Sequence, residues 1–283
     1  MSNKKNILLT GASGFIGTYF QKEYGEKYNI QTFSFLNDNL DLLDLSNIDT
    51  IIHLSALVHQ MGGASKEEYH KVNVENTEKL AKKAKSSGVK HFIFMSSIKV
   101  YGEETDDVYS ETTPCHPQDE YGISKLNAEN ILKEIEDNNF IVSIVRTPIV
   151  YGEGVKANIL SLVNIVKRVP ILPFYNTSNK RSMVYIGNLS ALLDAIIIKK
   201  LSGIFLASDD KSLSTSEFIQ LIAKVNNTKM VLIPIPFFKF LLKVLKPSHY
   251  KRLYKSLEVD NEYTKRILDF KNLYSIEDGI KYI

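Results

Sequence analysis

The feature that most constrains the fold is a glycine-rich turn near the N-terminus, which follows a short apolar run and precedes a helical pattern. Gly11, Gly14 and Gly17 have the spacing G-x-x-G-x-x-G. The first glycine permits a tight turn, the second lets an anion approach bare backbone, and the third lets the helix pack closely on the strand. The N–H groups at the helix start would face that anion. The turn therefore predicts a dinucleotide pyrophosphate site, with a plain strand–helix turn as the alternative.

The first 150 residues alternate β-rich runs with longer helical patterns. The predicted strands are Asn6–Thr10, Ile30–Phe35, Thr50–Leu54, His91–Ser96 and Val142–Thr147. The predicted helices between them are Phe15–Tyr24, Tyr69–Ser86 and Tyr121–Glu136. Continuous apolar runs such as Ile7–Leu9 are typical of strands that are covered on both faces. This alternation predicts an α/β fold, a Rossmann-type doubly wound parallel sheet with right-handed crossovers.

After Gly154 the pattern is looser. It predicts helices at Asn158–Val169 and Leu189–Lys199, a strand at Gly203–Ala207, a helix after Ser214, an apolar helix at Phe237–Leu245 and a charged tail with helical patches. We expect an NAD(P)-binding Rossmann domain at residues 1–152, with later pieces near 182–208, and mainly a smaller C-terminal substrate-binding lobe at 153–283. The apolar helix, with Lys239, Lys243 and Lys246, could rest on a membrane surface. Burial of its apolar face in the lobe is the expected outcome.

Composition narrows the classes of function. A net charge of +3 on 283 residues is too small to argue for a nucleic-acid partner. Cys115 is the single cysteine, which rules out an internal disulfide and any multi-cysteine metal site, and the six histidines show no metal-ligand spacing. The apolar stretch Val231–Leu245 is shorter than the roughly 20 residues that span a bilayer. We expect a cytoplasmic protein with no metal and no membrane insertion.

Other candidate cofactor contacts follow the second and third strands. The second strand ends near Ser34 without the acidic residue that selects a ribose, and without an arginine for a 2′-phosphate, so NAD and NADP both remain open. Asp44 and Leu45 are candidates for an adenine pocket, although Asp44 is equally consistent with an ordinary helix-start acid. The full candidate set around the cofactor is Gly11, Ser13, Gly14, Phe15, Ile16, Gly17, Ser34, Asp44, Leu45, Leu54, Ser55, Ala56, Tyr121 and Lys125.

A phenol and an amine lie four residues apart on one helical face, at Tyr121 and Lys125. A phenol with a pKa near 10 is a poor acid or base at neutral pH, and a nearby ammonium is expected to lower that pKa. The strand His91–Ser96 ends at the sheet edge where doubly wound folds bind ligands, and Ser97 there could hydrogen-bond a substrate oxygen. A surface Tyr–Lys pair and a loop-capping serine are the structural alternatives.

Together these elements resemble the extended short-chain dehydrogenase/reductase superfamily, in its NAD-dependent nucleotide-sugar epimerase/dehydratase branch. The resemblance covers nearly the whole chain and rests on Thr10–Gly17, His53–Ala56, Asn73, Ser96–Gly102, Tyr121–Lys125, Arg146–Gly152 and Arg181. It implies a catalytic triad of Ser97, Tyr121 and Lys125, with NAD or NADP as cofactor and NAD slightly preferred. It also implies a homodimer formed through a four-helix bundle of Tyr69–Ser86 and Tyr121–Glu136.

The resemblance also implies a substrate, a nucleotide sugar that we expect to be UDP-linked, bound by Ser97, Tyr121, Asn158 and Arg181. Arg181 is a natural bidentate ligand for a diphosphate, and a helix N-cap is the alternative role of Asn158. The 4,6-dehydratases of this family need an Asp–Glu pair directly after the catalytic serine or threonine. Ile98 and Lys99 stand there in this sequence, which argues against dehydratase activity.

Within the branch, the chain resembles UDP-glucose 4-epimerase-like proteins of polysaccharide biosynthesis, several of which are thought to reduce UDP-4-keto-6-deoxy-N-acetylhexosamines at C4. The lack of an acid near Ser34 suggests an exchangeable cofactor. We therefore expect a 4-ketoreductase, with an NAD-retaining 4-epimerase as the alternative. A non-catalytic NAD(P)-binding redox sensor is the alternative from another class, and such proteins usually lose the Tyr or Lys that this chain keeps.

Overall fold

The computed structural model describes residues 4–58, 64–105 and 107–283, and it is built on one six-stranded parallel sheet. The strand order is β10-β6-β4-β3-β1-β2, so the order reverses between β1 and β3. The strands are β1 (Asn6–Thr10), β2 (Asn29–Phe33), β3 (Thr50–His53), β4 (His91–Ser97), β6 (Ile141–Thr147) and β10 (Gly203–Leu206). The α/β prediction and the Rossmann-type parallel sheet are confirmed, and ligands of such folds bind at the strand-order reversal.

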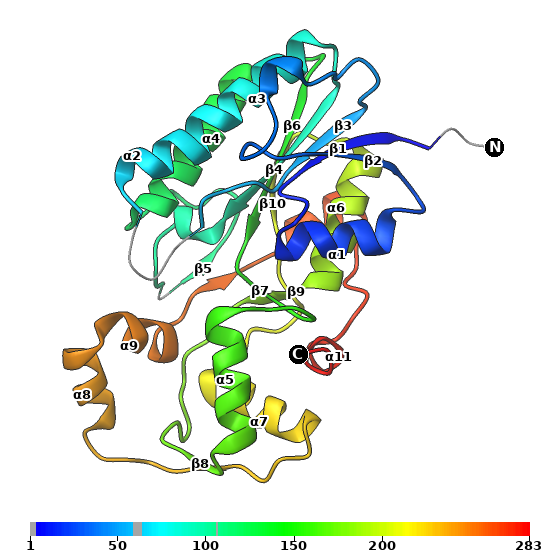
Figure 1. Ribbon diagram of the computed structural model, residues 1–283. Helices are drawn as coiled ribbons and strands as arrows, with labels where there is room; N and C mark the ends of the chain where they lie inside the picture. Colours follow the sequence, from blue (N-terminus) through cyan, green and yellow to red (C-terminus); the bar gives the residue numbers. More distant parts are fainter. Residues whose placement is uncertain (1–3, 59–63, 106) are drawn as a thin grey trace.

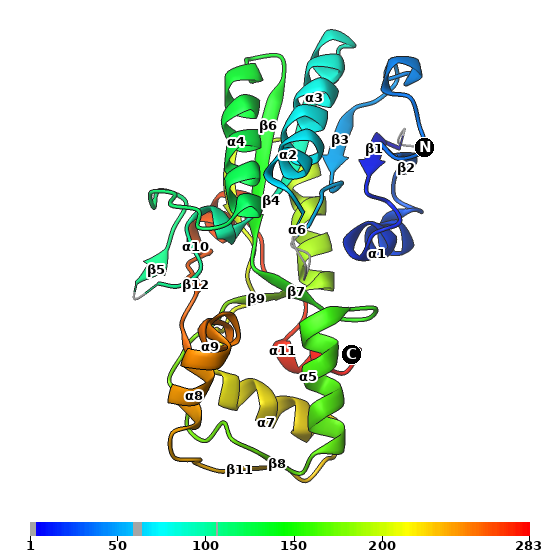
Figure 2. The same ribbon diagram turned by 60° about the vertical axis from the view of Figure 1, so that its left-hand side comes forward.

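Helices cover both faces of the sheet (Figures 1 and 2). One face carries α1 (Phe15–Tyr24) and α6 (Ile186–Lys199), and the other carries α3 (Asn76–Ser86) and α4 (Glu120–Ile135). Alternate residues of β1 pack on opposite faces of the sheet. Ile7 and Leu9 belong to the core under α1 and α6, and Leu8 belongs to the core under α3 and α4. This double coverage explains why the strands are apolar on both sides.

The predicted helix Tyr69–Ser86 is interrupted. It consists of α2 (Lys66–Tyr69), the π-helical turn η2 (His70–Glu75) and α3, and a capping box between Ser65 and Glu68 starts it. Such π-helical turns inside helices occur frequently at functional sites. Here the turn contains the buried Asn73, whose contacts are described below.

A second hydrophobic core lies in the lobe below the sheet (Figure 1). It is built mainly by α5 (Ala157–Arg168), α7 (Thr215–Val225) and α11 (Ile276–Ile280). Three short parallel ladders complete the structure, namely β7 (Ile149–Tyr151) with β9 (Met183–Tyr185), β8 (Ile171–Leu172) with β11 (Val231–Leu232), and β5 (Val108–Tyr109) with β12 (Glu258–Val259). The remaining elements are η1 (Leu40–Leu42), η3 (Ile98–Val100) and α10 (Glu262–Leu268).

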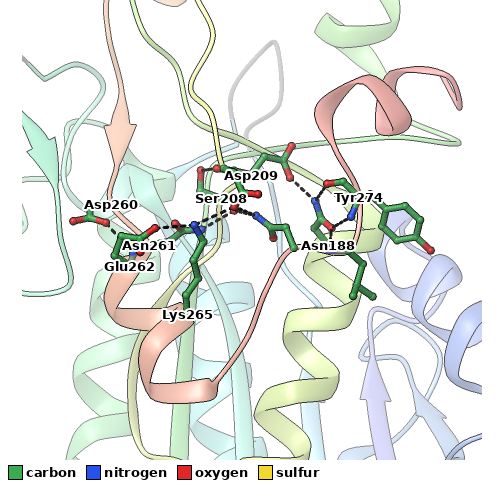
Figure 3. A network of polar contacts seen from close by, with 11 residues as sticks. Asn188, Ser208, Asp209, Asp260, Asn261, Glu262, Lys265 and Tyr274 are labelled. Atoms are coloured by element: carbon green, nitrogen blue, oxygen red, sulfur yellow. Dashed lines mark hydrogen bonds and ion pairs between the residues drawn. The ribbon is translucent and has the colours of Figure 1, made fainter.

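A polar network joins the lobe to the sheet (Figure 3). The buried Asp209 carboxylate accepts hydrogen bonds from the Tyr151 hydroxyl at 2.6 Å and from the Asn188 amide at 2.8 Å. The Asn188 oxygen in turn accepts from the backbone N–H of Tyr274 at 3.0 Å, and the Asn261 amide donates to the Ser208 carbonyl. These bonds fix the C-terminal segment against α6, because buried polar groups need such partners.

The expectation that the apolar helix is buried in the lobe is wrong. The helices α8 (Phe238–Leu245) and α9 (Pro247–Tyr254) form a hairpin on the outside of the lobe, and α8 has no buried residue (Figure 1). Phe240 and Leu245 are 67% and 68% exposed. The lobe core is already filled by α5, α7 and α11, so only the inner side of α8 finds partners. No helix in the described part of the chain is long and apolar enough to cross a membrane.

Candidate active site

The glycine-rich turn between β1 and α1 is closed by backbone contacts. Gly11 has a φ of 70°, and a Cβ there would lie 2.8 Å from the backbone nitrogen of Ser55. A Cβ on Gly17 would lie 2.3 Å from the carbonyl oxygen of Gly11. Any side chain at either position would therefore collide with backbone, so only glycine permits this turn and the close packing of α1.

The turn has the features of an anion site. Gly14 is the N-cap of α1, and neither a side-chain cap nor an acidic first-turn residue satisfies the free N–H groups there. Ser13 is exposed, whereas Phe15 and Ile16 are half-buried in the first turn. Unpaired N–H groups and the positive end of the helix dipole favour a phosphate at this position. The residues present thus fit the pyrophosphate of a dinucleotide.

The segment after β3 borders this turn. Leu54, Ser55 and Ala56 follow the strand directly, and the Ser55 N–H donates to the Thr10 hydroxyl oxygen at 3.2 Å. The structure therefore brings the 54–56 candidates beside Gly11, where the backbone of Ser55 leaves no room for a side chain. The parallel strands β1 and β3 end at one edge, which is the reason that segments far apart in sequence meet here.

A carboxylate that the sequence pattern did not reveal lies at the end of β2. Ser34 follows the strand directly, and its N–H donates to the Asp38 carboxylate at 2.7 Å. The backbone N–H groups of Asn37 and Asp38 return to the Ser34 carbonyl, so a tight turn brings the acid back to the strand end. The prediction that no acid stands near Ser34 is therefore wrong. The signal in the sequence was the Ser–x–x–x–Asp spacing of such a turn.

The two adenine-pocket candidates lie in different environments. Asp44 is exposed, and the Ser46 N–H that donates to its carboxylate at 2.9 Å lowers its pKa. The Leu45 side chain is 2% exposed and packs in the core with Leu8 and Ile51. The side chain of Leu45 is therefore part of the core and not of a pocket surface, because that position completes the packing under α3.

The three triad candidates meet at the carboxyl end of β4. Ser97 is the last residue of β4, and its hydroxyl lies close enough to the phenol of Tyr121, in the first turn of α4, to influence the pKa of that phenol. Asp119 caps that helix through the Gly122 N–H at 2.7 Å, which fixes where Tyr121 begins the turn. One helical turn later, the Lys125 Nζ donates to the Met95 carbonyl at 2.8 Å.

The expected lowering of the Tyr121 pKa by Lys125 is not found. Burial raises the pKa of the Tyr121 phenol to about 12, against a smaller lowering by the Ser97 hydroxyl. Burial also lowers the pKa of Lys125 to about 7, with the Glu129 carboxylate opposing. Each group loses hydration of its charged form, and the amine is directed at the Met95 carbonyl. In the free protein the phenol is neutral, so its ionisation needs a further positive charge.

The π-helical turn supports the triad from behind. The Asn73 amide donates to the Ser124 hydroxyl at 2.9 Å and to the Leu57 carbonyl at 3.0 Å, and its oxygen accepts from the Leu57 N–H at 2.7 Å. Ser124 in turn donates to the Tyr121 carbonyl at 2.8 Å. One buried side chain therefore couples the segment after β3 to the helix that carries the phenol.

A buried ion pair lies beneath the same strand end. The Arg146 guanidinium donates to Glu129 at 3.0 Å and 2.5 Å, and the Ser96 hydroxyl donates to the same carboxylate at 2.5 Å. Arg146 is 2% exposed, Glu129 is fully buried, and the Tyr101 ring lies 4.6 Å from the guanidinium. The pair ties α4 to β4 and β6, and so holds the residue next to Ser97 in place. The sequence showed Arg146 in a motif but gave no sign of its partner.

The two positions after Ser97 have no carboxylic acid. Ile98 is 3% exposed and packs in a hydrophobic cluster, and Lys99 forms ion pairs with Asp119 and with Glu103, the latter at 3.3 Å. An apolar buried residue and a paired ammonium cannot exchange protons with a sugar carbon as an acid–base pair does. The geometry is consistent with the argument against dehydratase activity.

Of the two predicted diphosphate ligands, only Arg181 has a described side chain. Its guanidinium donates to the Lys255 carbonyl at 3.1 Å. Burial lowers the pKa of Arg181 to about 10, the nearby Arg252 acts in the same direction, and Glu103 opposes. Arg181 therefore lies near Glu103, whose carboxylate pairs with Lys99 beside the triad. The side chain of Asn158 lies outside the described residues, and the N-cap of α5 is Lys156, so the N-cap alternative for Asn158 is wrong.

His53 is held inside the core by two threonines. Its ring nitrogens lie 2.7 Å from the Thr10 hydroxyl and 2.9 Å from the Thr77 hydroxyl, and burial lowers its pKa to about 3. Within residues 4–58, 64–105 and 107–283, no group of three or more His, Cys, Asp or Glu side chains could hold a metal ion.

The chain is similar in sequence to a known protein family and to curated proteins. Residues 7–204 match the NAD dependent epimerase/dehydratase family. A UDP-glucose 4-epimerase of Vibrio cholerae is 36% identical, over 98% of this chain and 94% of that protein. An N-acetyl-alpha-D-glucosaminyl-diphospho-ditrans,octacis-undecaprenol 4-epimerase of Escherichia coli O157:H7 is 29% identical, over 65% of this chain and 60% of that protein.

Solved structures share the fold over nearly the full length. MoeE5 in complex with UDP-glucuronic acid and NAD has a TM-score of 0.76 at 21% identity, covering 98% of this chain and 97% of that one. UDP-N-acetylglucosamine 4-epimerase from Bacillus cereus has a TM-score of 0.78 at 20% identity, with coverage of 98% and 97%. The family match and the Vibrio cholerae relative decide the assignment: the chain belongs to the NAD dependent epimerase/dehydratase family, whose members are NAD(P)-dependent enzymes.

Proposed function

We propose that the protein transfers hydride at C4 of a UDP-sugar and acts as a 4-epimerase that retains its NAD. The observation that supports this most is the proximity of Ser97 to the Tyr121 phenol, with Lys125 one turn away, at the sheet edge that also carries the glycine-rich turn. The 36% identity with a UDP-glucose 4-epimerase over almost the whole chain supports the substrate class and the reaction.

The cofactor has a set of residues that fit each of its parts. The turn Gly11–Gly17 would hold the pyrophosphate, and Lys125 the nicotinamide ribose. Asp38 would accept hydrogen bonds from the adenosine ribose, and its negative charge would oppose the 2′-phosphate of NADP, so NAD is preferred. When bound, the oxidised nicotinamide supplies the hydride acceptor and a positive charge near the triad.

The residues of this chain then handle the proton. Tyr121 Oη takes the proton of the sugar 4-hydroxyl, and Ser97 donates a hydrogen bond to the same oxygen. Because the pKa of Tyr121 is about 12 in the free protein, its phenolate forms only when positive charge is close. Lys125, with a pKa of about 7, gains a proton more readily beside that phenolate. After the 4-keto sugar has rotated so that its opposite face accepts the hydride back at C4, Tyr121 returns the proton to the 4-oxygen.

The diphosphate and the subunit arrangement are parts of the same proposal. Arg181 would pair with the UDP diphosphate, since its guanidinium is only partly used by the Lys255 carbonyl and lies near the charged groups beside the triad. Asn158 remains a predicted ligand of the same group. The dimer through α2–α3 and α4 remains a prediction, supported by the packing of these helices side by side on one face (Figure 2).

A 4-ketoreductase is the second candidate, and one observation favours it. Asp38 is exposed, so the adenosine end of the cofactor site faces solvent and would allow cofactor exchange. A missing acid near Ser34 would have favoured a reductase further, but the Ser34–Asp38 hydrogen bond removes that argument. The epimerase is therefore the preferred proposal. A redox sensor without activity is disfavoured, because Tyr121 and Lys125 are both in place.

Product mass separates these proposals. The purified protein is incubated with UDP-hexoses and with UDP-4-keto-6-deoxyhexoses, in the presence and absence of NADH or NADPH, and bound nucleotide is quantified. We expect near-stoichiometric bound NAD and a product of unchanged mass with altered retention. A product heavier by two hydrogens, formed only with added reduced cofactor, identifies the reductase. Bound cofactor without any product from either panel would refute both enzymatic proposals.

The role of Asp38 has its own test in the same assay. An Asp38→Asn variant keeps the size of the side chain and removes its charge. We expect NAD to dissociate more readily and the discrimination against NADP to fall. A matched Asp41→Asn variant, also exposed and in the next turn, should leave both unchanged. Equal NAD retention in Asp38→Asn and the native protein would show that this carboxylate does not select the ribose.

A further inference from the structure

We propose that α8 docks the C-terminal lobe on an anionic lipid bilayer. In this arrangement an exposed apolar face of the helix enters the boundary between headgroups and acyl chains, and nearby lysines lie among the lipid phosphates. The inference is independent of the reaction proposed above, because it uses none of the residues of the active site.

The first observation is a continuous apolar stripe, formed by Phe237, Phe240, Leu241, Val244 and Leu245. Phe237 is the N-cap residue just before α8, and Phe240, Leu241 and Val244 have the spacing i, i+1, i+4, which places these three on one face of the helix. The exposed fractions of these four residues are 84%, 67%, 53% and 60%. Contiguous exposed apolar surface of this kind marks a contact with a protein or a membrane.

The second observation is that the other sides of α8 are anchored. The Phe238 ring packs against Phe174 with 6.0 Å between centroids. The Lys239 ammonium lies 5.5 Å from the Tyr254 ring, and Lys243 lies 5.9 Å from the ring of Tyr250 on α9. The helix is therefore fixed to the lobe by two of its sides, and this attachment directs the apolar stripe outward.

The third observation is charge. Residues 229–255 contain seven of the 35 Lys and Arg residues of the chain and none of its 32 acidic residues. The formal charge of this segment, +7, exceeds the +3 of the whole chain, so the rest of the protein is net negative. Within the described residues, Lys239, Lys243 and Lys246 have no carboxylate partner, whereas Lys251 and Lys255 on and after α9 pair with acidic residues.

These observations together favour an anionic bilayer over a second copy of the chain as the partner of α8. A second copy would bring another strongly basic segment against the first, so contact between two α8 helices is opposed by like charges. An anionic bilayer offers both apolar surface and the opposite charge. With eight residues, α8 is far shorter than the roughly 20 needed to span a bilayer, so it would lie in the plane of the interface.

The surroundings of α8 extend the docking surface. Ile171 in β8 and Val231 in β11 are 51% and 56% exposed, and Ile235 in the connection to α8 is 47% exposed. In Figure 2, β8 and β11 lie at the end of the lobe that points away from the sheet, and α8 lies on the adjoining side of the lobe. A bilayer approached by this end would meet apolar side chains first and would leave the cofactor domain in water.

The experiment is co-sedimentation of the full chain with vesicles. Vesicles of phosphatidylglycerol and phosphatidylethanolamine are compared with vesicles of phosphatidylcholine alone, at low and high salt. We expect binding to the anionic vesicles that weakens with salt, and little binding to the neutral ones. No binding to anionic vesicles, or equal binding to both kinds, would overturn the proposal.

Two pairs of variants assign the binding to the apolar stripe. Phe240→Ser/Val244→Ser removes two exposed apolar side chains and should weaken vesicle binding by at least about 10-fold. Leu42→Ser/Leu273→Ser is the matched control, since these leucines are also 82% and 67% exposed but lie on other surfaces. The control should bind like the native protein. Equal binding by both double variants would overturn the assignment to α8.

The lysines are tested in the same way. Lys229→Gln/Lys246→Gln, which leaves the contacts of α8 with the Tyr250 and Tyr254 rings intact, should weaken binding to anionic vesicles by about 25-fold, since each lysine near such a surface contributes about fivefold. Lys71→Gln/Lys90→Gln, with exposed lysines far from α8, removes the same charge and should lose much less. Equal losses in the two variants would show that net charge alone is responsible and would overturn the docking geometry.

Two further readouts keep the result unambiguous. Turnover of a free UDP-sugar without vesicles, and the midpoint of thermal unfolding, should be the same in all four variants, which shows that the fold is intact. Light scattering reports the oligomeric state. If Phe240→Ser/Val244→Ser dissociates an oligomer and no variant affects vesicles, the stripe is an interface between copies of the chain, and the lipid proposal is wrong.

Discussion

The active-site end of the sheet and the outer end of the lobe differ in which side chains they bury and which they leave exposed. Beneath the triad, charged and polar groups are buried and paired, as in the Arg146–Glu129 ion pair and the contacts of His53 with two threonines. On α8, large apolar side chains such as Phe240 are exposed without a partner among the described residues. Beneath the triad most of the buried polar groups have partners within the chain, although the Arg146 Nη1 has none, whereas the exposed apolar surface of α8 is typical of a surface that contacts another molecule.

This difference predicts how much a substitution in each region should cost in stability or activity. At the sheet edge, removal of one member of a pair leaves an unsatisfied buried group, so substitutions there should be costly to stability or catalysis. On α8 the native chain already exposes the apolar surface to water, so substitutions should be nearly neutral in the isolated protein. The following predictions test this contrast, from the largest expected effect to the smallest.

The largest effect is expected at the phenol. Tyr121→Phe removes the group that we propose moves the proton, and positioned acid–base groups contribute about 10²- to 10⁴-fold to a rate. We expect kcat to fall by that factor, with bound NAD retained. Tyr69→Phe is the matched control, because its ring meets Tyr121 edge-on at 6.3 Å while its hydroxyl donates to the Val58 carbonyl. A Tyr121→Phe variant with near-native turnover would contradict the proposed role.

The buried ion pair should show the next largest effect. Arg146→Met leaves the Glu129 carboxylate buried and unpaired, which costs about 3 to 5 kcal/mol of unfolding free energy. Lys79→Met, in the exposed pair with Glu75 at 3.6 Å, should cost less than about 1 kcal/mol. Denaturant unfolding measures both. If Arg146→Met/Glu129→Leu recovers most of the loss, the cost lies in the unpaired charge; a double variant as unstable as Arg146→Met would argue against that explanation.

The buried histidines predict a pH dependence. Burial lowers the pKa of both His53 and His91 to about 3, whereas an unfolded histidine titrates near 6.5. Between these values the unfolded state binds more protons, so stability is present above pH ~6.5 and is lost as the pH falls, by about 1 kcal/mol per pH unit for each histidine. The difference in unfolding free energy between the native protein and His91→Gln should therefore shrink as the pH falls from 6.5 towards 4.

A constant difference between native protein and His91→Gln across that pH range would refute the assignment. The sign is specific to burial of the neutral ring, since a histidine paired with a carboxylate would have a raised pKa and the opposite slope. The Nε2 of His91 lies 2.8 Å from the Ser143 hydroxyl, so the neutral ring is held in place inside the sheet core.

The smallest effect is expected on α8. Phe240→Ser/Val244→Ser should change the unfolding free energy by no more than about 0.5 kcal/mol, because exposed side chains away from caps and pairs contribute little. The comparison substitution Leu242→Ser, on the half-buried side of the same helix, should cost more. If the exposed substitutions were as destabilising as Leu242→Ser, the stripe would be packed in solution, and the contrast between the two regions would fail.

Local patterns predicted most of the sheet domain. The β1 and α1 boundaries agree with the predicted ones, and the other four predicted strands of the first 150 residues end within two residues of the observed ends. The reason is that an unbroken apolar run between turn residues leaves few other ways to bury its side chains. The π-helical turn at His70–Glu75 could not be predicted, because its residues carry the same apolar period as an ordinary helix.

The sequence indicated which residues form the candidate site, but it did not predict the pKa values of those residues. Ser97, Tyr121 and Lys125 meet as their spacing suggested, yet the pKa of the phenol is raised because burial outweighs the amine four residues away. Asp38 was missed because a carboxylate four residues beyond a strand returns to it only through a specific turn. Both errors concern distances that depend on how segments are folded against one another.

The amino-acid sequence by itself determined the parallel α/β sheet and the glycine-rich turn, and it indicated the candidate catalytic residues, because these features follow from local periodicity, from residue spacing and from the backbone freedom of glycine. The tertiary structure alone decided which charges are buried together, as with Arg146 and Glu129, and which apolar face remains in water, as on α8. Burial depends on what the remote parts of the chain have already covered, and no local pattern contains that information.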